Sequence, residues 1–191
     1  MIEAFLLGLY VLLLSPLFVH FGFDEPHEIF FIFLAISLPG IYAMIKGAPY
    51  LPTEAKRVSD MIALAEITKK TRVVDLGCGD GRIVFAAIKA EAAYACGYEL
   101  SIPVYLFAKF KSLFYKNSEI IYQDFWKQKS IDHYSECDII FCFLMINPMK
   151  KFEKEIWPQL KTGTKVISNS FKLPNIKPAQ ELNGIRLYIK S

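Results

Sequence analysis

Residues 73–82 read VVDLGCGDGR, and this stretch constrains the fold more than any other part of the chain. Two β-branched residues lead into an aspartate, and glycine then stands at every second position. Glycine permits a tight turn and lets a ligand approach backbone N–H groups, and a helix N-terminus adds a partial positive charge. The stretch therefore predicts a strand that ends near residue 76 and turns directly into a ligand-binding helix start.

The rest of the chain after residue 50 alternates strand and helix patterns. Strands are predicted over residues 72–76, 93–100, 119–123, 138–144 and 164–170. Helices are predicted over residues 82–90, 104–115 and 150–160, with an earlier one that Thr53 caps and that ends near residue 67. Alternation of this kind predicts a doubly wound, mostly parallel α/β sheet.

The C-terminal tail departs from the alternation. Residues 178–182 and 185–189 flank the dipeptide Asn183-Gly184, which is a strong signal for a two-residue β-hairpin turn. The predicted sheet thus has seven strands and ends in an antiparallel pair.

The N-terminal region has a different composition. Residues 4–23 and 29–45 carry no formal charge, and the first 45 residues contain no lysine or arginine. At helical rise the first run would reach roughly 30 Å, the thickness of a bilayer core. We therefore predict a transmembrane helical hairpin over residues 1–46, in preference to a signal peptide or a buried helix pair. Basic residues follow the second run, so the rest of the chain is predicted on the cytoplasmic (or matrix) side of a multi-pass membrane protein with two spans.

These patterns divide the chain into three parts. The hairpin of residues 1–46 is followed by a linker and helix over residues 47–70, and then by the α/β domain over residues 71–191. The four cysteines form no C-x-x-C pair and have no histidine at metal-ligand spacing. They are predicted to be reduced thiols in the core, and no metal site is expected.

The glycine loop predicts the chemistry of the ligand. A dinucleotide site would read G-x-G-x-x-G, whereas the spacing here is G-x-G-x-G, with Asp75 two residues before the first glycine. A carboxylate in that position suits a cationic group better than a pyrophosphate. S-adenosyl-L-methionine offers a carboxylate, an ammonium group and a ribose, so we predict it as cofactor, in preference to a nucleotide or no cofactor. The loop glycines expected to contact it are Gly77, Gly79 and Gly81.

Two further acids stand at predicted strand ends. Glu99 lies 18 residues after Gly81, near the roughly 20 expected for an acid that binds a ribose. Asp124 follows the third strand, where it could receive the adenine amino group. Acids often end strands by chance, but Asp75, the glycines and Glu99 together favour a cofactor site.

Over about residues 49–190 the sequence resembles the class I, seven-β-strand methyltransferases. DLGCGDGR is similar to the first motif of that superfamily. PYLPT, DLGCGDGRIV, GYEL and FKLP further resemble the membrane-anchored lysine methyltransferases of ATP synthase c subunit and adenine nucleotide translocase, with their prokaryotic relatives. The resemblance implies a Rossmann-like methyltransferase domain that uses S-adenosylmethionine. Two predicted spans depart from the single anchor helix usual in the mitochondrial members.

The methyl acceptor is expected after the fourth strand. Asn147-Pro148 there resembles the start of the N-P-P-[FY] motif of enzymes that methylate planar nitrogens, but Met149 and Lys150 replace its last two residues. That argues against DNA adenine or glutamine methylation. Asn147 and Pro148 are acceptor-pocket candidates, with a helix cap as the alternative for Asn147. Tyr50 is a third candidate, with a surface turn as its alternative. No general base is assigned.

The sequence therefore supports one main hypothesis and two others. The main hypothesis is a membrane-anchored methyltransferase that acts on a lysine of a membrane-associated protein. The others are methylation of a lipid or lipophilic small molecule, and a catalytically inactive, cofactor-binding membrane assembly factor. The expected partners are the lipid bilayer and a membrane-protein substrate. Nucleic acid is not expected, because no basic patch interleaved with aromatic residues appears.

Overall fold

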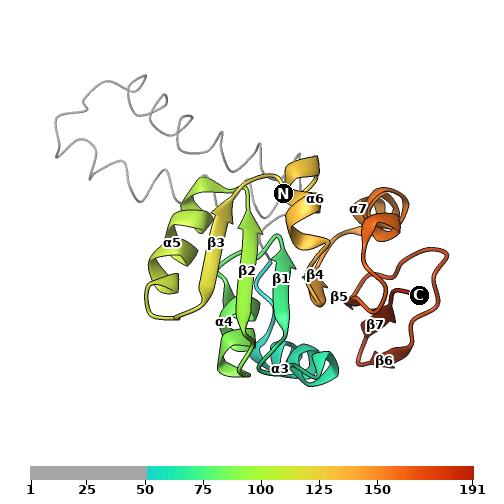
Figure 1. Cartoon of the computed structure of the whole chain (residues 1–191), viewed down its shortest axis with the longest axis horizontal. Coiled ribbons are helices and arrows are strands. Elements are labelled where there is room, and N and C mark those ends of the chain that lie inside the picture. The colour runs from blue at the N-terminus through green and yellow to red at the C-terminus, as the bar shows by residue number, and fades with distance from the viewer. Residues whose placement is uncertain (1–50) are drawn as a thin grey trace, which may run out of the picture. The chain divides into compact units, whose positions relative to one another are not determined.

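The computed structural model describes residues 51–191, which fold around one mixed seven-stranded sheet (Figure 1). The strands are β1 (Arg72–Leu76), β2 (Tyr94–Glu99), β3 (Ser118–Tyr122), β4 (Ile139–Cys142), β5 (Lys165–Asn169), β6 (Gln180–Leu182) and β7 (Ile185–Ile189). Their order is β3-β2-β1-β4-β5-β7-β6. β1 to β5 pair in parallel, and β7 runs antiparallel to both β5 and β6. The predicted Rossmann-like sheet and its C-terminal hairpin are confirmed.

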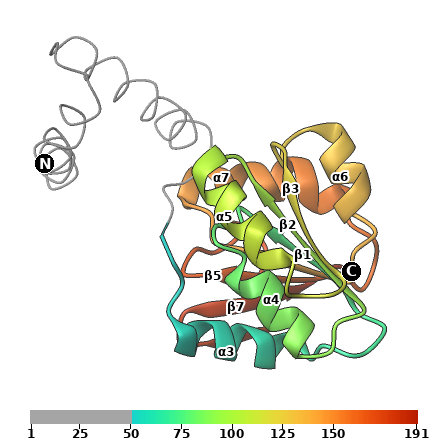
Figure 2. The same ribbon diagram turned by 90° about the vertical axis from the view of Figure 1, so that its left-hand side faces the viewer.

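Helices cover both faces of this sheet (Figure 2). They are α3 (Ala55–Ala65), α4 (Arg82–Lys89), α5 (Ile102–Ser112), α6 (Gln128–Tyr134) and α7 (Ile146–Lys151). Successive strand residues point to opposite faces. Val73 accordingly belongs to a core built with α3, α4 and α5, whereas Val74 belongs to a core built with α6 and α7. Because strand side chains alternate between the two faces and helices pack on both, the sheet has one apolar core on each side.

Two helices differ from the sequence prediction. The short helix α6 was not predicted, because only Ser130, Ile131 and Tyr134 of its seven residues are buried and its apolar pattern is weak. The predicted helix over residues 150–160 begins earlier, at Ile146, and becomes irregular after Lys151. Its last turn, Trp157–Gln159, is a 3-10 helix, since Pro158 has no N–H group to continue α-helical hydrogen bonding.

Helix α3 is tied to the distant end of the sheet by one arginine. Thr53 does not cap it, since Glu54 is the N-cap residue and no side chain caps the helix. Arg57 donates from Nε to Oδ1 of Asn169 at 2.9 Å and from Nη1 to the carbonyl oxygen of Asn183 at 3.1 Å. This guanidinium thereby joins α3, the end of β5 and the β6-β7 turn.

We expect Arg57→Ala to lower the free energy of unfolding by about 1–3 kcal/mol, because hydrogen bonds to a charged group are strong and Asn169 is buried. The neighbouring Lys56→Ala is the matched control. Lys56 makes only an exposed i,i+4 pair with Asp60, so its loss should cost about 0.3–0.5 kcal/mol. Urea unfolding of both variants measures the difference, and equal losses would show that the Arg57 contacts contribute little.

The predicted membrane location is contradicted by the helices that the structure describes. The longest of these, α3 and α5, have 11 residues each, and would extend only about 16 Å against a bilayer core of about 30 Å. Within residues 51–191 no helix combines the length and apolar character that a membrane span requires. The multi-pass localisation is therefore withdrawn. The hairpin predicted over residues 1–46 lies outside the described residues, and the boundaries predicted at residues 46 and 70 stay predictions.

Candidate functional site

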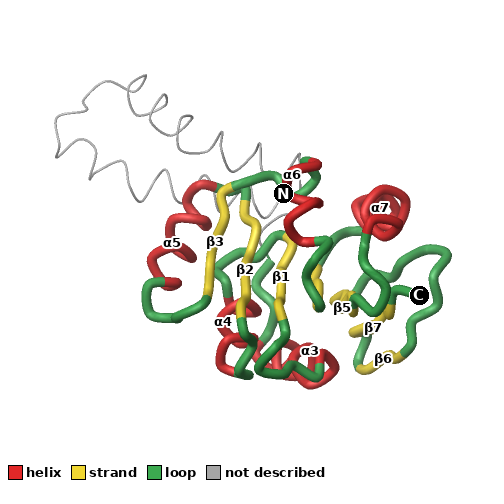
Figure 3. The backbone as a smooth tube through the Cα atoms, in the orientation of Figure 1, coloured by secondary structure: helices red, strands yellow, loops and turns green. Residues whose placement is uncertain are grey.

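The glycine loop joins the carboxyl end of β1 to the start of α4 (Figure 3). Its backbone is braced by the neighbouring strand, because the N–H groups of Gly77 and Cys78 donate to the carbonyl oxygen of Tyr98 at 3.0 and 2.9 Å. Gly81 is the N-cap of α4 and has a φ of 78°. A Cβ atom at Gly81 would lie 2.6 Å from Cε2 of Phe85, so this position requires glycine on both backbone and steric grounds.

Asp75 lies in the sheet beneath this loop and is only 3% exposed. Burial, together with the negative charges of Glu99 and Asp80, raises the pKa of its carboxyl group to about 8. Crowded carboxylates in an apolar setting favour the protonated form. A cation bound beside Asp75 would remove this penalty, so the site is electrostatically suited to a positively charged ligand.

Glu99 ends β2 and its carboxylate is held by three backbone N–H groups. Oε2 accepts from Gly79 at 3.0 Å, while Oε1 accepts from Leu100 at 2.8 Å and Ser101 at 2.7 Å. The side chain thus connects the glycine loop to the start of α5. Carboxylate oxygens accept more than one hydrogen bond each, so Glu99 can also receive ligand hydroxyl groups.

Asp124 follows β3 in the loop before α6 and is half-buried. Its Oδ1 accepts from the N–H of Trp126 at 2.9 Å. In the parallel register Leu76 lies opposite Tyr98, and Glu99 lies opposite Tyr122. The three predicted acids therefore stand at the same carboxyl edge, at or just after the ends of three adjacent strands.

A fourth acid, Asp80, was not singled out from the sequence. Its carboxylate contacts Nε of Arg82 at 2.8 Å and Nζ of Lys111 at 3.3 Å. Burial alone would raise the pKa of Asp80, but the hydrogen bond from Arg82 and the charge of Lys111 outweigh it and lower that pKa. Asp80 is thus neutralised by the protein, whereas Asp75 holds its proton at neutral pH and is left to ionise beside a cationic ligand.

Arg82 also holds the segment that precedes α3. Its Nη1 donates to the carbonyl oxygen of the buried Thr53 at 2.5 Å. From the other side, Nδ2 of Asn169 lies 3.5 Å from Oγ1 of Thr53. The end of the PYLPT motif is therefore held between the glycine loop and β5. Tyr50, the predicted pocket wall in this motif, lies outside the described residues.

The predicted acceptor residues lie beyond β4. Asn147 is exposed and Pro148 half-buried, and both are inside α7, whose N-cap is Met145. The alternative role of Asn147 as a helix cap is therefore wrong. Met149 is fully buried, with its sulfur 4.0 Å from Sγ of Cys142. No aromatic ring occupies the position that stacks on a planar base in N-P-P-[FY] enzymes.

Two phenylalanines at this edge were not predicted from the sequence. Phe143 directly follows β4 and Phe171 follows β5, and their rings stack with centroids 6.1 Å apart. Both are partly exposed. The turn that carries Phe171 is rigid, since the carbonyl oxygen of Phe171 accepts from Oγ of Ser168 at 2.5 Å and its N–H donates to the carbonyl oxygen of Asn169 at 2.8 Å. Aromatic residues just past adjacent parallel strands are the sequence signal that could have revealed the pair.

The cysteines lie in the core, and Cys78 in the glycine loop is not activated as a nucleophile. All four are free and buried, as the sequence predicted. Burial raises the pKa of the Cys78 thiol, and the charges of Asp75 and Glu99 add to the effect. A thiol that resists ionisation is a poor nucleophile.

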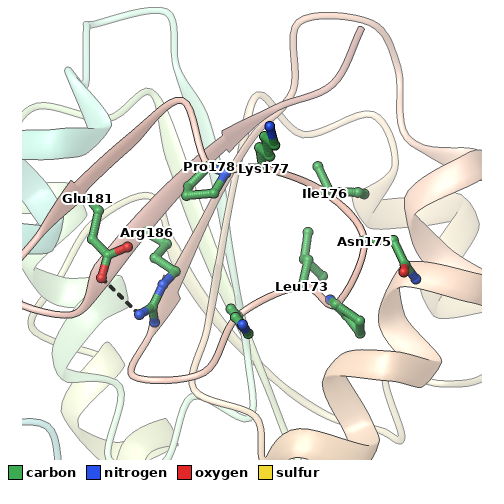
Figure 4. Close-up of a pocket in the computed structure, with 9 residues that line it drawn as sticks. Leu173, Asn175, Ile176, Lys177, Pro178, Glu181 and Arg186 are labelled. Atoms are coloured by element: carbon green, nitrogen blue, oxygen red, sulfur yellow. Dashed lines mark hydrogen bonds and ion pairs between the residues drawn. The ribbon is translucent and has the colours of Figure 1, made fainter.

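A separate pocket of about 400 Å³ lies on the loop after β5 and on the β6-β7 hairpin (Figure 4). Glu181 and Arg186 form an ion pair on its wall at 2.8 Å. None of the predicted cofactor or acceptor residues lines this pocket. This pocket is not the candidate functional site, because neither the glycine loop nor the buried Asp75 lines it.

The carboxyl edge fits S-adenosylmethionine. A buried acid with a raised pKa favours a cation, Glu99 retains acceptor capacity for hydroxyl groups, and the open space beside Gly77 lets a ligand approach the loop backbone. A crystal structure of an RNA methyltransferase from Salinibacter ruber, in complex with S-adenosyl-L-homocysteine, has a similar fold. The TM-score is 0.65 with 26% sequence identity, covering 72% of this chain and 91% of that one. The chain is thus an S-adenosylmethionine-dependent methyltransferase of class I, and the predicted cofactor and enzyme class are confirmed.

The family follows from two comparisons. Residues 75–180 match the family model described as the ANTKMT methyltransferase domain. A protein-lysine N-methyltransferase of Saccharolobus islandicus is 31% identical over 140 residues, which is 71% of this chain and 84% of that protein. An adenine nucleotide translocase lysine N-methyltransferase of Mus musculus is 30% identical over 133 residues, which is 68% of this chain but only 56% of the mouse protein. The chain belongs to the ANTKMT methyltransferase family.

Proposed function

We propose that this enzyme is a protein-lysine N-methyltransferase. The observation that carries the proposal is the family membership, since the relatives from Saccharolobus islandicus and Mus musculus are both named as lysine methyltransferases. The acceptor side supports it, because Lys150 stands where N-P-P-[FY] enzymes have the aromatic residue that stacks on a planar base, and this lysine is exposed. A membrane protein as the acceptor, predicted from the sequence, stays part of this proposal.

Different residues of the chain bind the cofactor and the acceptor. Bound S-adenosylmethionine supplies an electrophilic methyl group on a sulfonium. In the proposal, Asp75 pairs with the cofactor's ammonium group, Glu99 receives the ribose hydroxyls, Asp124 receives the adenine amino group, and the glycine loop holds the carboxylate. All of these lie at or just after the ends of β1, β2 and β3, so in the proposal the acceptor approaches from the β4 and β5 side of the same edge.

A lysine acceptor must arrive without its proton. Its reference pKa is near 10.4, so only about 1 in 2,500 lysines is neutral at pH 7. The Phe143-Phe171 pair offers aromatic walls for the aliphatic stem and for the cationic form before deprotonation. An apolar wall and a neighbouring sulfonium both lower a lysine pKa. The proposal therefore requires orientation and exclusion of water by the protein, and no general base is assigned.

The test is to incubate the purified full chain with S-adenosylmethionine carrying a labelled methyl group, together with host proteins, host lipid extract or host RNA. We expect base-stable label in protein, mapped to lysine by mass spectrometry. Glu99→Gln should remove at least 90% of that label, because it weakens cofactor binding. Glu91→Gln is the matched control, since Glu91 only pairs with Lys69 at the surface, and it should keep wild-type activity.

Three outcomes would replace the proposal. Label that extracts into organic solvent would support methylation of a lipid or lipophilic small molecule. Label in RNA would assign the activity named for the Salinibacter ruber structure. Label on a protein residue other than lysine would contradict the proposed acceptor chemistry.

A further inference from the structure

Helix α5 leaves most of its large side chains exposed, and its fully buried residues are small, although Tyr105 packs partly against the core. Only Ala108 and Ser112 of the helix are buried, and they pack toward the sheet. The exposed large apolar side chains on α5 and the turn after it, here named the α5 stripe, are Ile102, Leu106, Phe107, Phe110, Leu113 and Phe114. Phe110, Leu113 and Phe114 are 63%, 75% and 74% exposed. Contiguous exposed apolar surface of this kind marks an interaction site.

The stripe is continuous and free of acidic charge. At about 100° per residue its six positions fall within roughly 140° of the helix circumference, and they extend over about 18 Å. No aspartate or glutamate occurs between Leu100 and Ser118. The surface therefore matches the apolar face of one partner helix in both width and length.

Two lysines border the stripe, but their amines turn back to the domain. Nζ of Lys109 donates to the carbonyl oxygen of Ile120 at 3.3 Å. Nζ of Lys111 lies 3.3 Å from Oδ2 of Asp80 and 5.3 Å from the ring centroid of Phe107. Because both cations are engaged within the domain, they are not directed at phosphate groups. On helix α5 itself, therefore, neither lysine amine is directed at the phosphate groups of RNA or anionic lipid, and the exposed Lys116 lies beyond the stripe.

The stripe begins at the candidate site. Ser101, which precedes Ile102, donates its N–H to the carboxylate of Glu99. Further along, Lys111 binds the carboxylate of Asp80 in the glycine loop. Helix α5, which lies beside β3 in Figure 1, is therefore linked to the glycine loop through Glu99 at its start and through Lys111 further along. A segment bound along α5 would be held in a defined position relative to the site.

We infer that the α5 stripe binds an uncharged, apolar helical segment of the methyl-acceptor protein, next to the lysine that is methylated. This inference rests on the proposed lysine methylation and adds the chemistry by which the acceptor is chosen. Burial of exposed phenylalanine and leucine side chains supplies the affinity. The fixed link between α5 and the glycine loop then places the acceptor near the cofactor.

The experiment uses two fluorescent peptides with the same lysine and flanking residues, one of which continues into a Leu/Ala helix of about 15 residues, roughly the length at which an isolated helix forms. Binding to the full chain is measured by polarisation in the presence of S-adenosylhomocysteine. The wild type should bind the helical peptide about 10-fold or more tightly than the short one. Phe110→Ser combined with Phe114→Ser should remove this preference, a change of about 1.4 kcal/mol or more. Both residues are exposed, so melting temperatures should stay close to wild type.

The chain provides a matched control at the opposite end of the sheet. Leu182 and Ile189 are also exposed, by 43% and 48%, and their double change to serine should leave the preference intact. Equal binding of both peptides by the wild type, or an unchanged preference in the Phe110 and Phe114 variant, would overturn the inference. A dimer, or binding to phosphatidylserine vesicles, that the same variant abolishes would assign the stripe to a second copy or a lipid surface instead.

Failure of this inference can be separated from failure of the proposed function. Methylation of host protein at lysine, with no effect of the α5 variant on peptide binding, would overturn only the inference. Label in lipid or RNA would overturn the proposed function, whatever the peptides show.

Discussion

Asp75→Asn is expected to abolish cofactor binding and, at the same time, to stabilise the ligand-free protein at pH 8. Affinity for S-adenosylmethionine should fall about 100-fold or more, or about 2.8 kcal/mol, because the carboxylate proposed to pair with the ammonium group is gone. Isothermal titration calorimetry of the wild type and of Asp75→Asn with S-adenosylmethionine measures the difference in affinity. Wild-type affinity should also rise between pH 6 and pH 8, since a cation beside Asp75 favours release of its proton.

The stabilisation follows from the sign of the pKa shift. Burial, with the charges of Glu99 and Asp80, raises the pKa of Asp75 from 3.8 to about 8. Between those values the folded protein holds a proton that the unfolded chain releases, so the stability contributed by this group is present at low pH and is lost as pH rises. Asparagine does not titrate. The variant should therefore gain on the order of 5 kcal/mol over the wild type at pH 8, and less than about 1 kcal/mol near pH 4.

Asp138→Asn provides a control with the opposite sign. Burial alone would raise the pKa of Asp138, but hydrogen bonds from the Arg72 N–H and from Lys161 outweigh it and lower that pKa. Its contribution to stability is therefore present at neutral pH and is lost as pH falls. This variant should be destabilised at pH 8 and should keep cofactor affinity. If both variants changed stability in the same direction at pH 8, the assigned charge states would be wrong.

Gly97→Ala should both destabilise the fold and weaken cofactor binding, although Gly97 lies in β2 and not in the glycine loop. A Cβ atom there would lie 2.5 Å from Cβ and 2.6 Å from Sγ of Cys78, and 2.9 Å from Cγ2 of Val84. Overpacking of a core costs about 1–3 kcal/mol. Relief of the clash would move Cys78, whose N–H bond to Tyr98 braces the loop. We expect affinity for S-adenosylmethionine to fall about 10-fold or more, which corresponds to about 1.4 kcal/mol.

Gly163→Ala separates the two effects. Gly163 has a φ of 89°, and a Cβ atom at this position would have nothing within 4 Å, so alanine there introduces backbone strain without a clash. Thermal unfolding should show a loss of about 1 kcal/mol, while titration should show unchanged cofactor affinity. Retained affinity in Gly97→Ala as well would mean that the position of Cys78 does not matter to the site.

The local sequence was sufficient to predict the strands of the sheet and the glycine loop. β1 was predicted at residues 72–76 and α4 from residue 82, where the structure has them, because β-branched residues and glycines act over a few positions. The hairpin at Asn183-Gly184 was found for the same reason. Helix α6 was missed because tertiary burial of three residues, and not a strong apolar pattern, stabilises it.

The face of α5 could not be predicted. Its sequence is apolar on several sides, so periodicity does not say which side packs on the sheet. In the structure the sheet accepts Ala108 and Ser112, because small residues allow the helix to approach β2 and β3, and the larger side chains are left outside. The Phe143-Phe171 pair was equally hidden, since 27 intervening residues separate two rings that adjacent strands bring together.

The sequence by itself determined that a strand, a glycine loop and a helix would bind an S-adenosylmethionine-like ligand, because that junction is local and its acids stand at strand ends. Only the tertiary structure decided which acid is left for a cationic ligand. Asp75 precedes the glycines and Asp80 stands among them, but Arg82 and the distant Lys111 neutralise Asp80. Asp75 lies buried beside Glu99, and charge pairing across the fold cannot be read from spacing along the chain.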